Sequence, residues 1–246
     1  FTETVILSDT PIAEQIICAV DLGINTDAVC SIMKADGTIL ARKFIDFTSD
    51  KDRMIHTMNR TRRKQSKYGP KSTRGLWAYV KRLNEDRAKK ISAAIVEFAS
   101  QHSVDAIVME YLDFKGCKKR GSKAQRLSMW NHGIIREKVE QKAHLLGIRI
   151  ATICAWKTSA LAFDGSGSVT RDDNNHALAT FTTGKQYNCD PSASYNIGAR
   201  YFIRELLKSL PATEESRVKA KVPDAGRRTS CTLSTLRALV KELSAA

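Results

Sequence analysis

Apolar residues gather in three short runs that lie far apart in the chain. The runs cover residues 16 to 21 (IICAVD), 104 to 110 (VDAIVME) and 148 to 154 (IRIATIC). Runs of this length and composition are typical of strands that are buried on both faces. The first two runs end on a carboxylate, which indicates that the ends of these strands meet a polar site.

Two further β-rich stretches follow the first run. Residues 28 to 35 (AVCSIMKA) and 38 to 47 (TILARKFIDF) are joined by Asp36-Gly37. An Asp-Gly dipeptide between two such stretches is a signal for a β-hairpin. Together with the three apolar runs, this hairpin predicts a mixed five-stranded sheet with three antiparallel and two parallel strands.

Helical spacing of apolar residues predicts the helices that flank this sheet. By contrast, residues 156 to 188 are rich in Gly, Ser, Thr, Asp and Asn and show little periodicity, which favours an insert before the last core helix. The polar, basic stretch after Pro211 is predicted to be a linker. The fold class is therefore α/β, and the predicted helices cover residues 76 to 102, 134 to 147, 192 to 209 and 232 to 243.

The same pattern divides the chain into parts. The opening residue is Phe1 rather than Met, so we expect a piece of a larger protein whose residues 1 to 15 end a preceding domain or form a linker. The predicted parts that follow are a core at 16 to 155 with a basic helical segment at 51 to 102, the insert at 156 to 188, the last core helix at 189 to 210, and a C-terminal linker and helix at 211 to 246.

The charge of the chain points to a polyanionic partner. Its 246 residues include 40 Lys and Arg against 26 Asp and Glu, which gives a net charge of +14. This surplus is more than solubility requires, so nucleic acid is the expected partner. A membrane is the rival polyanion, but no apolar run approaches the roughly 20 residues of a spanning helix. The six cysteines are scattered and are expected to be reduced thiols.

The strongest charge segment is residues 51 to 90, which hold fourteen Lys or Arg and three acidic residues. Such a density predicts salt-dependent phosphate contacts, although a solvated helix face is the simpler alternative. Trp77 and Tyr79 in this segment are expected to dock on the sheet, and stacking on nucleic acid is the alternative. A second basic stretch, residues 115 to 133, predicts a loop that presents Trp130 to a ligand. The predicted nucleic-acid-binding residues are Arg60, Arg62, Arg63, Lys64, Lys67, Lys71, Arg74, Lys118, Lys119, Arg120, Arg171 and Lys185.

Three carboxylates stand where the predicted elements end or begin. Asp21 and Glu110 each close a predicted strand, and Asp190 opens the late helix. Cleavage of a phosphodiester by two metal ions needs carboxylates that converge on ions about 3.5 to 4 Å apart. Hard oxygen ligands suit Mg²⁺ or Mn²⁺. If the acids converge, repulsion should raise the pKa of at least one of them. The alternative for each acid is a loop or helix-cap position, and Asp190 followed by Pro191 fits a cap.

The sequences around these acids resemble the three RuvC motifs of the transposon-encoded TnpB nucleases, which type V CRISPR effectors share. The motifs are AVDLGIN at 19 to 25, IVMEYL at 107 to 112 and CDPSASYNIGARYF at 189 to 202. The resemblance implies an RNase H-like (RuvC) fold in which the three acids are catalytic and bind Mg²⁺ or Mn²⁺. It also matches Asn196 to the family's Asn in the helix after the third motif, where a structural and a catalytic role are both open.

The chain departs from the family at the zinc ribbon that TnpB proteins usually carry between the second and third motifs. Thr158-Ser159, which precede the ribbon in the family, are present, but residues 162 to 165 (AFDG) replace the CxxC that follows. A structural zinc takes four ligands, and the cysteines and histidine nearby offer at most three. We therefore expect no structural zinc and describe the insert as a degenerate zinc-ribbon-like lobe.

Lys185 stands where the family often has an arginine near the scissile strand. Lysine keeps the charge but loses the two-pronged geometry that binds a phosphate. The aromatic residues of the lobe would stack on unpaired bases, or they only pack the lobe. They are Phe163, Phe181 and Tyr187.

By this resemblance the chain is expected to be the RuvC nuclease portion of an RNA-guided DNA endonuclease. The implied partners are a guide RNA, double- and single-stranded target DNA, and an N-terminal recognition region of the same protein, with no membrane partner. The implied location is the prokaryotic cytoplasm, at the nucleoid. Two alternatives stay open. One is an RNA-guided DNA-binding protein without cleavage, which the intact acids argue against, and the other is a guide-independent RuvC-type nuclease.

Overall fold

The computed structural model describes residues 4 to 112, 130 to 172, 175 and 177 to 245. Three predicted nucleic-acid contacts, Lys118, Lys119 and Arg120, lie outside the described residues, as does most of the predicted basic loop.

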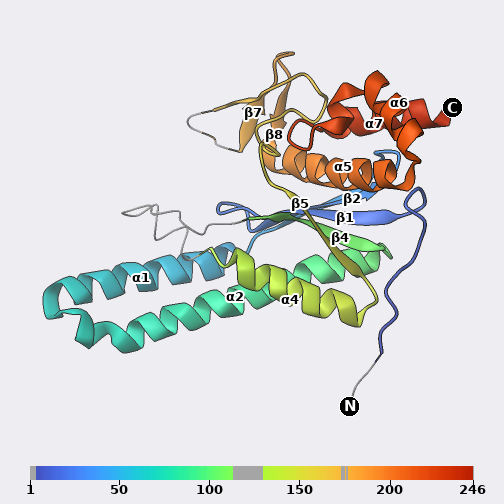
Figure 1. Cartoon of the computed structure of the whole chain (residues 1–246). Helices are drawn as coiled ribbons and strands as arrows, with labels where there is room; N and C mark the ends of the chain where they lie inside the picture. Colours follow the sequence, from blue (N-terminus) through green and yellow to red (C-terminus); the bar gives the residue numbers. More distant parts are fainter. Residues whose placement is uncertain (1–3, 113–129, 173–174, 176, 246) are drawn as a thin grey trace.

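A mixed five-stranded sheet forms the centre of the molecule and confirms the predicted sheet (Figure 1). The strand order is β3-β2-β1-β4-β5; the β1–β2 and β2–β3 pairs are antiparallel, and the β1–β4 and β4–β5 pairs are parallel. The two parallel pairs bring the three separate apolar runs of the sequence side by side. The strands are β1 Ile16–Asp21, β2 Ala28–Lys34, β3 Ile39–Ile45, β4 Ala106–Tyr111 and β5 Arg149–Cys154.

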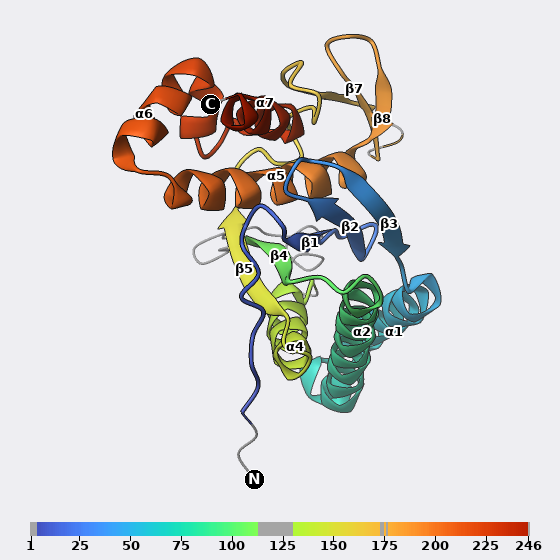
Figure 2. The same cartoon turned by 90° about the vertical axis from the view of Figure 1, so that its right-hand side faces the viewer.

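Helices cover both faces of this sheet (Figures 1 and 2). One face carries α1 Thr48–Tyr68, α2 Arg74–Gln101 and α4 His132–Leu145, and the other carries α5 Cys189–Ser209, α6 Ala212–Lys221 and α7 Leu233–Ser244. Short 3-10 helices, η1 Pro70–Thr73 and η2 Pro223–Gly226, precede α2 and follow α6. In the part of the chain that the structure describes, no helix is both long and apolar enough to cross a membrane.

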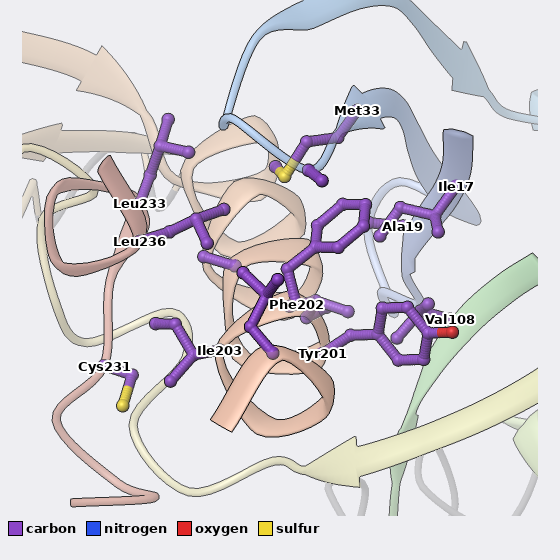
Figure 3. Close-up of a cluster of buried hydrophobic side chains, with 14 of the residues drawn as sticks. Ile17, Ala19, Met33, Val108, Tyr201, Phe202, Ile203, Cys231, Leu233 and Leu236 are labelled. Carbon is purple, nitrogen blue, oxygen red and sulfur yellow. The ribbon is translucent and has the colours of Figure 1, made fainter. Parts of the chain in front are cut away.

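Alternate residues of β1 enter two different cores, which explains why its sequence is apolar without interruption. Cys18 and Val20 pack toward α2 and α4, whereas Ile17 and Ala19 pack toward α5. Figure 3 shows the second core, where Phe202 of α5 is fully buried. A Cβ at Gly198 would come within 2.9 Å of the Met33 side chain, so this glycine lets α5 lie close against the sheet.

The basic segment folds as a long hairpin of α1 and α2 whose far end extends beyond the sheet (Figure 1). The prediction that Trp77 docks on the sheet is wrong. Trp77 packs instead between the two helices against Met54, Met58 and Val80, and its indole N–H donates to Gln65 Oε1 at 2.8 Å. The C-terminal part of α2 covers the sheet. In the projecting part of the hairpin, the apolar residues pack against one another.

In the C-terminal half, one segment holds strands that the sequence did not predict, and one prediction is wrong. Residues 156 to 188 have little periodicity but contain a small antiparallel sheet of β6 Thr170–Arg171, β7 Leu178–Thr180 and β8 Gln186–Asn188. The stretch after Pro211, predicted to be a linker, is helix α6. Acidic residues in its first turn and basic residues in its last turn suit the helix dipole, and Val218 anchors it in the core.

Candidate active site

The sheet and α5 bring the three predicted acids to one place, at the C-terminal ends of β1 and β4. Asp21 is the last residue of β1 and Glu110 is the next-to-last residue of β4. These strands are parallel neighbours, and Val20 pairs with Met109. Each acid is the next residue after one of these partners, so Asp21 and Glu110 lie side by side. Residues two positions earlier, Ala19 and Val108, pack toward α5. Side chains alternate along a strand, so both carboxylates face the helix that carries Asp190. We call Asp21, Glu110 and Asp190 the acid cluster.

Electrostatics show that the three carboxylates act on one another. Burial raises the pKa of Asp21 well above its ordinary value, and the negative charges of Glu110 and Asp190 raise it further. The positive charge of Arg171 opposes them. Burial also raises the pKa of Glu110, against a hydrogen bond from Thr158 and the charge of Arg200. The sequence-based expectation of one raised pKa agrees with this arrangement.

Asp190 is not the cap of its helix. The N-cap of α5 is Asn188, whose side chain accepts a hydrogen bond from the Asp190 backbone N–H at 3.0 Å. Asp190 therefore lies in the first turn of α5, and its carboxylate does not cap the helix. The helix-cap alternative from the sequence is wrong because the cap lies two residues earlier.

A tight turn after β5 places Thr158 against the acid cluster. Thr158 is 3% exposed, and its hydroxyl donates to Glu110 Oε1. The preceding residue, Lys157, has a φ of 59°. Residues other than glycine adopt this left-handed backbone conformation only at a cost in conformational energy. Surrounding contacts must therefore hold this turn in place.

Two side chains of α5, one helical turn apart, supply those contacts. Asn196 donates to the Thr158 and Leu161 carbonyl oxygens at 3.0 and 2.9 Å. Arg200 donates to the Cys154 and Trp156 carbonyl oxygens at 2.9 and 2.8 Å. The remaining amide oxygen of Asn196 accepts from the Leu233 backbone N–H. These backbone contacts favour the structural role for Asn196 over the catalytic one.

The sequence did not reveal Arg200 or Asp27. Arg200 is a charged residue at a core position of the predicted helix, 5% exposed, and that position was the available signal. Asp27 is 2% exposed and forms ion pairs with Arg87 and Lys51, while one of its oxygens accepts from the Phe47 backbone N–H. It joins the loop after β1 to the base of the α1–α2 hairpin, and no sequence pattern marked it.

The chemistry of the acid cluster suits a hard divalent cation. Three carboxylates supply only oxygen ligands, which hard divalent cations prefer, and burial and two neighbouring negative charges raise the pKa of Asp21. As the side chains stand, no three His, Cys, Asp or Glu in the described ranges form a group ready to hold a metal ion. The types of ligand atom therefore fit a divalent cation. In this structure, however, the Glu110 carboxylate accepts a hydrogen bond from Thr158 and is not directed at a shared ion.

The aromatic residues of the lobe pack against one another, which agrees with the alternative that they only pack the lobe. The Phe163 ring centroid lies 5.5 Å from that of Phe181 and 5.0 Å from that of Tyr187. The Lys185 ammonium lies 4.7 Å from the Phe163 ring centroid, and the residue is exposed to solvent. This aromatic cluster gives the lobe its own core. The absence of zinc stays a prediction.

The hairpin presents a dense positive surface. Its seven predicted contact residues are exposed, and none forms an ion pair with a carboxylate of the described chain. No Asp or Glu occurs between residues 53 and 84. Paired cations such as Arg87 and Lys90 lie nearer the sheet. We call the seven residues the basic hairpin tip: Arg60, Arg62, Arg63, Lys64, Lys67, Lys71 and Arg74.

One predicted contact in the lobe, Arg171, lies near the acids. Arg171 is exposed, its guanidinium donates to the Ser159 carbonyl at 3.3 Å, and its charge lowers the pKa of Asp21 against burial and repulsion. The fold thus brings Arg171 to the acid cluster, while it leaves the basic hairpin tip on a separate projection (Figure 1).

Comparisons with known proteins give a likeness of fold. No family model matches the sequence, and a search of the curated proteins found no match. Among solved structures, the chain is similar to the Cas12f1–sgRNA–target DNA complex, with a TM-score of 0.56 and 19% identity over 77% of this chain. A CRISPR-Cas12f ternary complex gives 0.51 and 17%, and the AacC2c1–sgRNA binary complex gives 0.55 and 10%, each over the same 77%. The chain spans 51%, 40% and 39% of those proteins.

Proposed function

We propose that this chain is the RuvC nuclease portion of an RNA-guided DNA endonuclease, with an RNase H-like fold and a two-metal-ion mechanism. The observation that carries the proposal is the acid cluster. Three carboxylates come together from β1, β4 and α5: burial raises the pKa of Asp21, and the charges of Glu110 and Asp190 raise it further.

In this proposal Asp21, Glu110 and Asp190 hold Mg²⁺ or Mn²⁺. When bound, the two ions would activate a water molecule and stabilise the leaving oxygen of the cleaved phosphodiester. The chain itself supplies the geometry: the paired ends of β1 and β4 fix two carboxylates, and the first turn of α5 fixes the third. A nearby cation, Arg171, is placed to bind a phosphate of the DNA strand beside the acids.

The basic hairpin tip is proposed to hold the nucleic-acid backbone away from the site of cleavage. Its cations are exposed and are not neutralised by carboxylates of the described chain, so they are available to phosphates. Lys185 is a weaker candidate because its ammonium lies over three aromatic rings of the lobe. Bases would not insert into these rings, since the rings pack on one another.

Guide RNA and target DNA are proposed partners. They are the ligands named for the structurally similar complexes, and the net charge of +14 suits them. Base pairing to the guide would read the sequence while the protein holds the backbone. Because the chain spans about half or less of those proteins, guide and target recognition are proposed to need a further region of the same protein.

The test is cleavage by the intact parent protein with its co-purifying RNA in Mg²⁺. Single-stranded DNA, RNA-matched duplex and branched DNA are compared for wild type, Asp21→Ala and Glu110→Ala. Asp9→Asn, which changes an exposed acid outside the cluster, is the matched control.

The proposal expects cleavage of guided targets by wild type and the control, and binding without cleavage by the two variants. Binding of a guided target with no cleavage by wild type would favour a targeting protein instead. Cleavage of branched DNA without RNA would favour a guide-independent nuclease.

A further inference from the structure

The turn after β5 does more than connect two elements, because it carries the one hydroxyl that touches the acid cluster in the described structure. Thr158 Oγ1 donates to Glu110 Oε1 and also lies 3.1 Å from the Ala155 carbonyl oxygen. A threonine hydroxyl has a single hydrogen, so it donates to one of these acceptors at a time.

We infer that Thr158 is a positioning residue for Glu110, which sets the orientation of that carboxylate toward a divalent cation. The inference rests on the proposed function and deepens it. With the hydroxyl on Glu110, one carboxylate oxygen is fixed and the other is left for a metal ion. With the hydroxyl turned to Ala155, Glu110 can reorient without leaving a buried O–H group unsatisfied.

The position of Thr158 is set by the same helix that carries the third acid. Asn196 and Arg200 of α5 hold four carbonyl oxygens of the turn, on residues 154, 156, 158 and 161. These bonds also fix the left-handed Lys157 that turns the chain into Thr158. Movement of α5 would therefore move Asp190 and the support of Glu110 together.

Outer partners of this kind orient metal ligands, and their loss typically weakens metal binding about 10- to 100-fold. Thr158→Val keeps the shape of the side chain and removes the hydroxyl, whereas Thr158→Ser keeps the hydroxyl. Thr61→Val is the matched control, since Thr61 is a fully buried threonine whose hydroxyl binds a carbonyl on α1.

The experiment measures Mn²⁺ binding by calorimetry and thermal unfolding, together with the Mg²⁺ concentration for half-maximal cleavage by the intact parent protein. We expect Thr158→Val to weaken Mn²⁺ binding about 10- to 100-fold and to raise the Mg²⁺ requirement, with Thr158→Ser and Thr61→Val near wild type. Thermal unfolding without metal checks that each variant is folded.

The Asp21→Ala variant distinguishes a failure of the Thr158 inference from a failure of the proposed metal site. If Asp21→Ala loses Mn²⁺ binding and a folded Thr158→Val does not, the role of Thr158 is overturned and the proposed function stands. If Asp21→Ala binds Mn²⁺ as tightly as wild type, the proposed metal site itself fails. Should Thr158→Val not fold, a folded Asn196→Ala, which removes support from the Thr158 turn, takes its place. Mn²⁺ binding by Asn196→Ala as tight as by Thr158→Ser would then overturn the inference.

Discussion

The acid cluster and the basic hairpin tip carry opposite charges. They also differ in how the surrounding structure supports their side chains. Each acid sits at the end of a core element, and Glu110 is held by Thr158 within a network that reaches α5. The cations of the tip stand on a projecting hairpin whose own packing rests on Met54, Met58, Val80 and Trp77 (Figure 1).

This difference indicates a division of labour. A fixed, partly buried site suits chemistry that depends on the orientation of ligands. An exposed row of long cationic side chains suits a polyanion that is recognised by charge rather than by shape. The joint between the two regions is the buried pair of Asp27 and Arg87, at the base of the hairpin and next to the loop after β1.

The largest expected effect is on cleavage. Asp190→Asn should lower guided cleavage more than about 100-fold, beyond the cost of losing an outer partner of a metal ligand. Binding of guided DNA should stay within about 2-fold, because the basic hairpin tip is untouched. Gel-shift and cleavage assays on the same samples check this, and equal loss of binding and cleavage would contradict the division of labour.

The joint should matter for stability. Asp27→Asn leaves the Arg87 charge without its buried partner, and breaking such a pair costs about 3 to 5 kcal/mol of unfolding free energy. Asp86→Asn, which removes an exposed partner of Lys90, is the control and should cost less than about 1 kcal/mol. Urea unfolding of both variants is the measurement, and similar losses would show that the joint is not special.

The charges of the tip should affect binding alone. Replacing Arg62, Arg63 and Lys64 together by Gln removes up to three phosphate contacts, so the slope of log K against log salt should fall by up to about 2.7. Unfolding free energy should change by less than about 0.5 kcal/mol because these residues are exposed. The control removes the same charge elsewhere, at Arg227, Arg228 and Lys241. An equal change in slope there would mean that net charge, not the tip, binds the DNA.

Relief of repulsion in the acid cluster should stabilise the metal-free chain. Burial and two neighbouring carboxylates raise the pKa of Asp21 above its value in the unfolded chain, so its contribution to stability is lost as pH rises through the folded-state pKa. Asp21→Asn should therefore gain about 0.5 to 2 kcal/mol at neutral pH, and the gain should shrink in acid. Thermal unfolding from pH 4 to 8 checks the sign, and a destabilised Asp21→Asn at pH 7 would refute it.

The smallest effect distinguishes the cap of α5 from the carboxylate that α5 contributes to the acid cluster. Asn188→Ala removes the N-cap and should cost about 1 kcal/mol. Asp190→Asn should cost less, because Asp190 does not cap the helix. Thermal unfolding of the two variants in one buffer compares them, and the opposite order would return the cap to Asp190.

The sheet and the main helices could be predicted from sequence because their signals are local. Apolar runs marked β1, β4 and β5, and an Asp-Gly turn marked the hairpin of β2 and β3. Helix α6 was missed because only Val218 of its ten residues is buried, which leaves no apolar stripe. The strands of the lobe have two or three residues, too few for any period to show.

The acids of the candidate site and Asn196 could be named from sequence, but the other supports of the site could not. Asp21, Glu110 and Asp190 stand at the ends of recognisable elements. Thr158 and Arg200 act through carbonyl and carboxylate oxygens that only the folded chain brings near them. The same holds for Asp27, whose partners lie 24 and 60 residues away along the chain.

The most direct test of the central claim is anomalous diffraction from crystals of the parent protein bound to an uncleavable guided DNA and soaked in Mn²⁺. The account predicts two peaks about 3.5 to 4 Å apart, ligated by Asp21, Glu110 and Asp190 and by one phosphate of the DNA. Peaks located elsewhere, or none beside these three carboxylates while the DNA strand occupies the site, would contradict it.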